Sequence, residues 1–265
     1  DLARPLHSRG EVGAETSGPV LELAHAADAW GSVAEGRVDD RRDEAIVVGI
    51  QGGKTITGQM WDGTSWTALS INPLGDAKNA ESFSFDVAYE TQSGDALLMW
   101  NDSPNLKFSV WDGSSWTAPT TVAAYTGADP VHLRLDSSPV SDEMVLVLTD
   151  GSNHDYALVW DGSSWGDEIQ LNTVGSQNVT DVSVTFEQQR GHAMVAYAKD
   201  QVDVHYRTWD GTSWSGENTL TAVAGALGKA RWTMMDADPN SDHIVMGVIT
   251  ESSDAYLAIW DGSTW

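Results

Sequence analysis

The sequence predicts an all-β protein assembled from repeated, four-stranded antiparallel sheets. A hexapeptide of the form Trp-Asp-Gly-(Ser/Thr)-(Ser/Thr)-Trp occurs five times in the 265 residues, and its copies begin at Trp61, Trp111, Trp160, Trp209 and Trp260. Successive copies therefore lie 50, 49, 49 and 51 residues apart, a period typical of propellers and other repeat architectures. Several segments between copies alternate apolar and polar residues, which indicates strands that bury one face.

Each repeat contains four segments with strand character. In the repeat that ends at Trp116 these are residues 66–71, 83–89, 96–100 and 106–111. The counterparts of the second segment are 131–135, 182–186 and 232–235. The counterparts of the third, 144–148, 193–197 and 244–246, are continuously apolar, as in strands buried on both faces. A four-stranded unit repeated at this spacing predicts a blade of a β-propeller, with blades ending near residues 66, 116, 165, 214 and 265.

The hexapeptide itself predicts a hairpin turn. Asp-Gly between two strands is a strong turn signal, because glycine adopts positive φ at little cost and the aspartate accepts local backbone N–H groups. The flanking tryptophans can pair across the turn. We therefore interpret as structural turn residues the following set: Trp61, Asp62, Gly63, Trp66, Trp111, Asp112, Gly113, Trp116, Trp160, Asp161, Gly162, Trp165, Trp209, Asp210, Gly211, Trp214, Trp260, Asp261, Gly262 and Trp265. Sugar-stacking platforms are the competing interpretation of the ten tryptophans.

The two ends of the sequence bear on ring closure. Residues 1–16 have no apolar period and read as an arm or linker, leaving 17–265 for the propeller. The strand-like segment Val20 to Leu23 could pair with Ile259 and Trp260 and so close a ring of five blades. Alternate repeats resemble each other most, however, and a two-blade alternation suits an even ring of six or more, with the remainder outside this sequence. Five blades is the preferred expectation.

Composition excludes several classes of function. Thirty-nine acidic and fourteen basic residues give a formal net charge of −25, which repels nucleic acids and anionic lipid surfaces. With zero cysteines the chain has neither disulfides nor thiolate metal sites. No apolar run is long enough to span a bilayer. We expect an extracellular or cell-surface location.

The repeats resemble the tandem WDG-repeat propellers of large bacterial and archaeal cell-surface proteins. The resemblance rests on the hexapeptides together with residues 85–90, 94–97 and 238–245, and it covers about residues 30–265. It implies a propeller fold and no assigned reaction, so it carries no catalytic residue to this chain. The first repeat is degenerate, which leaves the blade count open.

The residues give little support to catalysis. The seven histidines form no metal-binding motif, and neither a nucleophile elbow nor a phosphate-binding loop is present. A glycosidase needs two unlike carboxylates facing each other across the sugar. The carboxylates here instead follow the repeat, at Asp39, Glu90, Asp136, Glu187 and Asp236. We interpret them as hairpin residues, with a weak calcium-binding ring as the alternative.

Aromatic residues that break the repeat are the candidate ligand contacts. They are the three tryptophans outside the hexapeptides: Trp30, Trp100 and Trp232. The preferred function is a non-catalytic structural or adhesive surface module, with a filament subunit as one form of it, whose partners are its own copies, surface proteins or glycans. The alternative is a carbohydrate-binding lectin with repeated sites, and a glycoside hydrolase ranks third. No cofactor other than calcium is expected.

Overall fold

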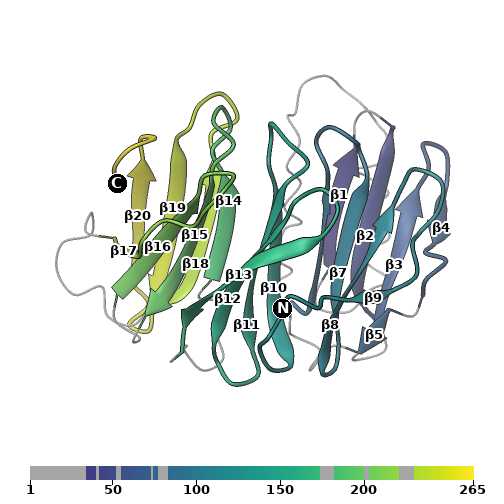
Figure 1. Ribbon diagram of the computed structural model, residues 1–265, viewed down its shortest axis with the longest axis horizontal. Helices are drawn as coiled ribbons and strands as arrows, with labels where there is room; N and C mark the ends of the chain where they lie inside the picture. The colour runs from purple at the N-terminus through teal and green to yellow at the C-terminus, as the bar shows by residue number, and fades with distance from the viewer. Residues whose placement is uncertain are drawn as a thin grey trace. The chain divides into compact units, whose positions relative to one another are not determined.

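The structure is a computed structural model, and it describes residues 34–39, 42–51, 55–72, 74–76, 83–173, 182–199, 203–220 and 230–265. These residues form five antiparallel sheets joined by turns, and they contain no helix (Figure 1). Accordingly, no helix that could cross a membrane is found in the described part of the chain. The chain divides into two compact units, of residues 1–89 with 94–122 and of residues 90–93 with 123–265.

Unit 1 holds the first two sheets. The first sheet runs in the order β1-β2-β3-β4, and β5 also pairs with β3. Its strands are β1 (Ala34–Asp39), β2 (Glu44–Gln51), β3 (Thr55–Trp61), β4 (Trp66–Ala68) and β5 (Gly75–Asp76). The second sheet runs β6-β7-β8-β9. Its strands are β6 (Phe85–Tyr89), β7 (Ala96–Asp102), β8 (Asn105–Trp111) and β9 (Thr120–Thr121).

Unit 2 holds the other three sheets, each again a meander of sequential strands. The third sheet consists of β10 (Pro130–Ser137), β11 (Met144–Asp150), β12 (Asp155–Trp160) and β13 (Trp165–Asn172). The fourth consists of β14 (Val182–Phe186), β15 (Ala193–Lys199), β16 (Asp203–Trp209) and β17 (Asn218–Thr219). The fifth has three strands, β18 (Ala230–Ala237), β19 (Ile244–Thr250) and β20 (Ala255–Trp260).

The outer strand of each of the first four sheets follows the hexapeptide turn. In the first sheet Trp66–Ala68 pairs with the strand that ends at Trp61, so this segment closes the first sheet and does not open the second. β9, β13 and β17 occupy the same place in the next three sheets. The sheets therefore continue past residues 66, 116, 165 and 214, at which the sequence placed the ends of the blades. The proposed closing strand, Val20 to Leu23, lies outside the described residues.

The central strands are apolar on both faces because sheets pack against each other. In unit 2, the third sheet contributes Val145, Val147, Ala157 and Val159 to a buried cluster with Val182, Phe186, Val195 and Tyr197 of the fourth. The opposite face of the fourth sheet, including Met194 and Ala196, packs on Ile244, Met246 and Trp260 of the fifth. In unit 1 the first and second sheets share a third cluster, with Ile46, Val48, Phe85 and Trp100 among its members. This explains why strands such as β11 and β15 lack apolar alternation.

The five hexapeptides form five similar turns. In the first, Asp62 Oδ1 accepts the backbone N–H groups of Thr64 at 2.9 Å and Ser65 at 2.8 Å, and Gly63 has φ +87°. The indole rings of Trp61 and Trp66 lie with centroids 5.7 Å apart. Hydrogen bonds from the Thr64 side chain and the two backbone N–H groups lower the pKa of Asp62 to about 2. The turn aspartates are thus anionic acceptors that hold the loop closed.

The turn glycines are required for backbone conformation even where nothing crowds them. Gly162 is exposed and has φ +90°, and an added Cβ would make only an ordinary contact, 3.4 Å from Asp142 Cβ. We expect Gly162→Ala to lower the free energy of unfolding by about 1–2 kcal/mol, because an alanine there must adopt the left-handed region. Urea unfolding measures this difference. Gly216→Ala is the matched control, since Gly216 is exposed with open space around its Cβ position, and equal effects of the two substitutions would contradict the assignment.

Candidate functional site

A hydrogen bond from a tryptophan to a glutamate recurs at four junctions along the chain. The first tryptophan of a hexapeptide donates its indole N–H to a glutamate in the β-turn region of the preceding repeat. The donor–acceptor distances are 3.1 Å for Trp111 to Glu44, 2.6 Å for Trp160 to Glu90, 3.4 Å for Trp209 to Glu143 and 2.6 Å for Trp260 to Glu187. The first lies within unit 1 and the other three within unit 2, to which residues 90–93 belong. The repeat thus provides a tryptophan donor to the preceding repeat and a glutamate acceptor to the following one.

Two of the four junctions also carry an arginine. In unit 1, Arg42 Nη2 lies 3.2 Å from Asp95 Oδ1, and Arg42 Nη1 lies 4.0 Å from Glu44 Oε2, the oxygen that accepts Trp111. The guanidinium also lies over the next hexapeptide turn, since a Cβ at Gly113 would approach Arg42 Nη1 to 2.8 Å. Burial raises the pKa of Glu44, opposed by the Trp111 hydrogen bond and by Arg42. We call Arg42, Glu44, Asp95 and Trp111 the Arg42 group.

Unit 2 repeats this arrangement around Arg190. Its Nη1 atom lies 3.6 Å from Glu187 Oε2 and donates to the backbone carbonyl of Gly262 at 2.6 Å, while its Nε lies 3.2 Å from Asp242 Oδ2. The Glu187 side chain is 3% exposed, whereas the Arg190 side chain is 49% exposed. Burial raises the pKa of Glu187, and the hydrogen bond from Trp260 opposes it. We call Arg190, Glu187, Asp242 and Trp260 the Arg190 group.

One carboxylate oxygen of the Arg190 group has acceptor capacity left. Glu187 Oε1 accepts Trp260, but the buried Oε2 meets no hydrogen-bond donor at bonding distance. Arg190 Nη1 and His192 Nδ1 both lie 3.6 Å away from it. Buried carboxylate oxygens are normally hydrogen-bonded. A hydroxyl group that entered beside the exposed guanidinium could donate to Oε2 and accept from arginine.

The other two junctions carry serine in place of arginine. Ser93 stands where the fourth sheet has Arg190, and it donates its hydroxyl to Glu90 Oε2. Ser141 stands where the first sheet has Arg42, and its hydroxyl lies 3.4 Å from Glu143 Oε2. These hydroxyls satisfy the glutamates locally. The arginines therefore distinguish two junctions, one in each unit, from the rest.

The turns between the first and second strands of the sheets also bond to one another, in a pattern that alternates. Asp142 Oδ1 accepts the backbone N–H groups of Gln92 and Ser93. One hundred residues on, Asp242 Oδ1 accepts those of Gln189 at 2.8 Å and Arg190 at 3.0 Å. The side chains of Gln92 and Gln189 add bonds to the backbone carbonyls of Val140 and Asn240. This explains the two-repeat alternation in the sequence.

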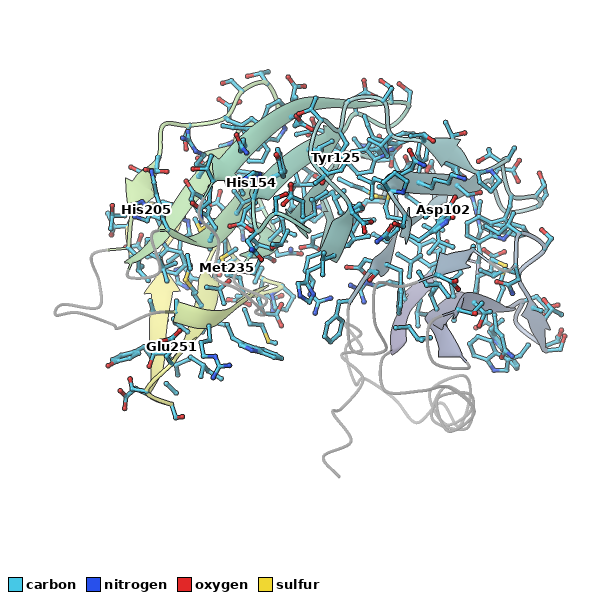
Figure 2. The ribbon with its side chains drawn as sticks, turned by 90° about the horizontal axis from the view of Figure 1, so that it is seen from below. Asp102, Tyr125, His154, His205, Met235 and Glu251 are labelled. Carbon is cyan, nitrogen blue, oxygen red and sulfur yellow. The ribbon has the colours of Figure 1, made fainter. Side chains whose placement is uncertain are left out.

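A further polar cluster lies on the fourth sheet. Glu217 accepts the Tyr197 hydroxyl at 2.8 Å and Lys199 Nζ at 2.6 Å, and His205 Nδ1 lies 3.5 Å from it. Tyr197 and His205 stack at 6.1 Å, and His205 is labelled in Figure 2. Hydrogen bonds from Lys199 and Tyr197 outweigh partial burial and lower the pKa of Glu217. These groups satisfy one another, which favours a structural role.

Of the three candidate ligand contacts, the structure describes Trp100 in unit 1 and Trp232 in unit 2. Trp100 is fully buried in the cluster between the first and second sheets, so it is a core residue. Trp232 is half-buried on β18, and Trp30 lies outside the described residues. Among the hexapeptide tryptophans, Trp160, Trp209 and Trp260 are buried, which leaves no open ring face on them for sugar stacking.

The repeated carboxylates lie in different environments from one sheet to the next. Glu90 and Glu187 follow the first strand of the second and fourth sheets and accept tryptophan, whereas Asp236 is exposed on β18. Asp39 ends β1 and Asp136 lies within β10. No group of three or more His, Asp or Glu side chains able to hold a metal ion occurs in the described ranges. The arginines of the two groups were not among the sequence candidates, although each replaces the serine of another repeat.

Comparison with solved structures relates the fold to β-propeller lectins. The fungal lectin of Aleuria aurantia, described as six-bladed with a novel fucose recognition mode, superposes with a TM-score of 0.54 at 13% identity, covering 88% of this chain and 75% of the lectin. The lectin BP39L of Burkholderia pseudomallei gives 0.63 at 7% identity, covering 88% and 68%. AofleA of Arthrobotrys oligospora gives 0.58 at 9% identity, covering 89% and 71%. At such identities the likeness shows the fold, which is that of a β-propeller.

Other comparisons find no relatives. No family model matches the sequence, and no curated protein matches it significantly. The resemblance to WDG-repeat surface proteins therefore remains a prediction. The Aleuria lectin has six blades, whereas five was the preferred expectation from the sequence and six the alternative.

The tryptophan–glutamate bond can be tested at Glu187. We expect Glu187→Ala to lower the free energy of unfolding by about 2–3 kcal/mol, because it leaves the buried Trp260 indole N–H without an acceptor. Glu187→Gln keeps an acceptor oxygen and should cost less than about 1 kcal/mol. Urea unfolding followed by tryptophan fluorescence measures both variants. If the alanine variant is no less stable than the glutamine variant, the hydrogen bond does not stabilise the fold.

Proposed function

We propose that this protein binds carbohydrate as a non-catalytic lectin and that its sugar sites are the Arg42 group and the Arg190 group. The observation that carries the proposal is the pairing of an exposed guanidinium with a buried carboxylate oxygen, Glu187 Oε2, that lacks a hydrogen bond. The shared fold with lectins, several of which are described as fucose-binding, supports the class of ligand. The alternative function from the sequence, a lectin, is therefore better supported than the structural or filament role.

The chemistry of the two groups suits sugar hydroxyls. A hydroxyl both donates and accepts, so neighbouring hydroxyls on a pyranose ring can donate to a carboxylate while they accept from a guanidinium. Arginine offers several N–H donors in a fixed plane, which orients the sugar as well as binding it. In both groups the indole beside the carboxylate holds that acceptor in place. Fucosides are the ligands that we propose to test first.

The surroundings of the carboxylates favour binding over hydrolysis. Hydrolysis needs one carboxyl to donate a proton and a second, separate carboxylate to act as nucleophile or base. In the Arg190 group, Asp242 is engaged by two backbone N–H groups and by Arg190 Nε, and Glu187 accepts Trp260. These contacts occupy Asp242 and one oxygen of Glu187 with hydrogen bonds from the protein itself. We propose that neither has a catalytic role.

Blade number and location belong to the same proposal. Five sheets occur in the described residues, and the likeness to a six-bladed lectin supports the even ring that the alternation of repeats favours. We propose six blades in the complete ring in place of five closed by Val20 to Leu23. An extracellular or cell-surface location suits a glycan-binding protein of this charge.

Titration with α-methyl-L-fucoside tests the proposal. We expect up to two sites in the parent chain, and we expect Arg190→Ala or Glu187→Gln to weaken one of them by about 10- to 100-fold, the cost of losing a charge-assisted hydrogen bond. Arg42→Ala should weaken the other. Glu143→Gln is the matched control at a junction without arginine and should leave binding unchanged. Absence of binding to fucosides and to a broad glycan array would overturn the proposal, as would binding that survives both arginine substitutions.

A further inference from the structure

The fifth sheet exposes an apolar face. Met234 on β18, Val245 and Ile249 on β19, and Leu257 and Ile259 on β20 are 49%, 42%, 47%, 78% and 63% exposed. The strand register places them on one face, because Met234 lies opposite Gly247 and then Leu257, and Val245 lies opposite Ile259. Met235, labelled in Figure 2, points to the other face, where it is buried against the fourth sheet. Contiguous apolar patches of this kind mark interaction surfaces.

The same face of the third sheet is covered by another sheet. Positions one hundred residues earlier have the same register, with Asp136 opposite Val145 and then Val159, and Arg134 opposite Val147 and then Ala157. There Val145, Val147, Ala157 and Val159 are fully buried against β14 and β15 of the fourth sheet. The exposed face of the fifth sheet is therefore the counterpart of a sheet-to-sheet interface within unit 2.

The alternation of the repeats indicates which type of sheet fits this face. The third and fifth sheets share the turn Ser-Asp-Glu/His, at 141–143 and 241–243, and the third is followed by an even-numbered sheet. The face of the fourth sheet that covers it presents Val182, Val184 and Phe186 of β14 with Val195 and Tyr197 of β15. A sheet of this even-numbered type is thus the complement of the fifth sheet by shape and by apolar character.

In unit 1, the first tryptophan of one hexapeptide lacks the glutamate acceptor that its counterparts have. Four of the five first tryptophans of the hexapeptides donate to a glutamate of the preceding repeat, but the indole N–H of Trp61 is buried without an acceptor. Each acceptor for a tryptophan of an odd-numbered sheet, Glu90 or Glu187, comes from an even-numbered sheet. Trp61 belongs to the odd-numbered first sheet, so its missing acceptor also points to an even-numbered neighbour.

We propose that the apolar face of the fifth sheet seats a sixth sheet of the even-numbered type, which continues the repeat beyond the fifth as the fourth continues it beyond the third. The sixth sheet packs apolar side chains on Leu257, Ile259 and Val245. Its first hexapeptide tryptophan meets His243, which stands in the fifth sheet where the third has Glu143. This inference rests on the six-bladed ring proposed above, and its test does not depend on glycan binding.

Chains extended by one repeat test the proposal. A copy of residues 166–219 placed after Trp265 supplies an outer strand for the fifth sheet and then an even-numbered sheet. A copy of residues 117–172 in the same place supplies an odd-numbered sheet and is the matched control. Because the sequence has no cysteine, Leu257→Cys in the parent and in both extended chains gives a single thiol on the face. Asn218→Cys, on the exposed β17, reports whether an extension changes thiol reactivity away from this face.

We expect alkylation of the Leu257→Cys thiol to be about tenfold slower in the even-type extension than in the parent, as for a thiol protected by native packing. The odd-type extension should protect it less, and Asn218→Cys should react equally in all three. Equal reactivity of the Leu257→Cys thiol in the parent and the even-type extension would overturn the proposal. So would a parent that already protects this thiol, either as a monomer covered by its own residues 1–33 or as a dimer detected by light scattering.

A second measurement separates docking from a failure to fold. Leu257→Asp should leave the melting midpoint of the parent chain unchanged, since Leu257 is 78% exposed there. In the even-type extension the same substitution should lower the midpoint by about 5 °C, because it buries a carboxylate in the new interface. An extension that folds, shown by strand content in circular dichroism, yet tolerates Leu257→Asp would contradict the proposal.

Discussion

The structure depends on packing between neighbouring repeats within each unit, and the tryptophan–glutamate hydrogen bond fixes how the packed elements of a unit meet. The central strands are apolar on both sides, so burial alone would allow two sheets to slide against each other. An indole N–H that must find a carboxylate removes this freedom, because either group left buried and unpaired costs about 1–3 kcal/mol. The bond recurs at four junctions with different distances, from 2.6 to 3.4 Å, on a common geometry.

This constraint links the repeat to function. The hexapeptide turn places a tryptophan at the end of the third strand of a sheet, and this tryptophan holds a buried or half-buried glutamate of the neighbouring repeat. Where the same turn carries an arginine, as at Arg42 and Arg190, the junction gains a cation whose side chain is partly exposed, 26% at Arg42 and 49% at Arg190. Where it is serine, the glutamate is satisfied internally. A structural contact used at every junction thereby becomes a candidate binding site at two of them.

Much of the fold could be predicted from the sequence because the repeat amplifies weak signals. Asp-Gly turns, paired tryptophans and strands of period two recur five times, and the structure places strands where most of the segments were expected. The assignment of Trp66–Ala68 to the first sheet could not be read from periodicity, since pairing partners are set by three-dimensional contacts. Strands β11 and β15 do not alternate because both of their faces are buried. Their continuous apolar sequence predicted this burial.

The candidate site was harder to predict. Aromatic residues that break the repeat were the expected ligand contacts, but Trp100 is a core residue. The departures from the repeat that form the site are Arg42 and Arg190, which replace serine in a turn. Each arginine is part of a site only because a glutamate lies on the same turn and a tryptophan about seventy residues away donates to that glutamate. Contacts of that separation require the packed structure.

Indole N–H resonances would test the central role of the tryptophan–glutamate bond most directly. Hydrogen exchange of the tryptophan side chains, followed by nuclear magnetic resonance, should show slow exchange for the four donors Trp111, Trp160, Trp209 and Trp260. The second tryptophans Trp66, Trp165 and Trp265, which have no acceptor, should exchange faster. Equally fast exchange in both sets would contradict the account, because the junctions would then be held by apolar packing alone.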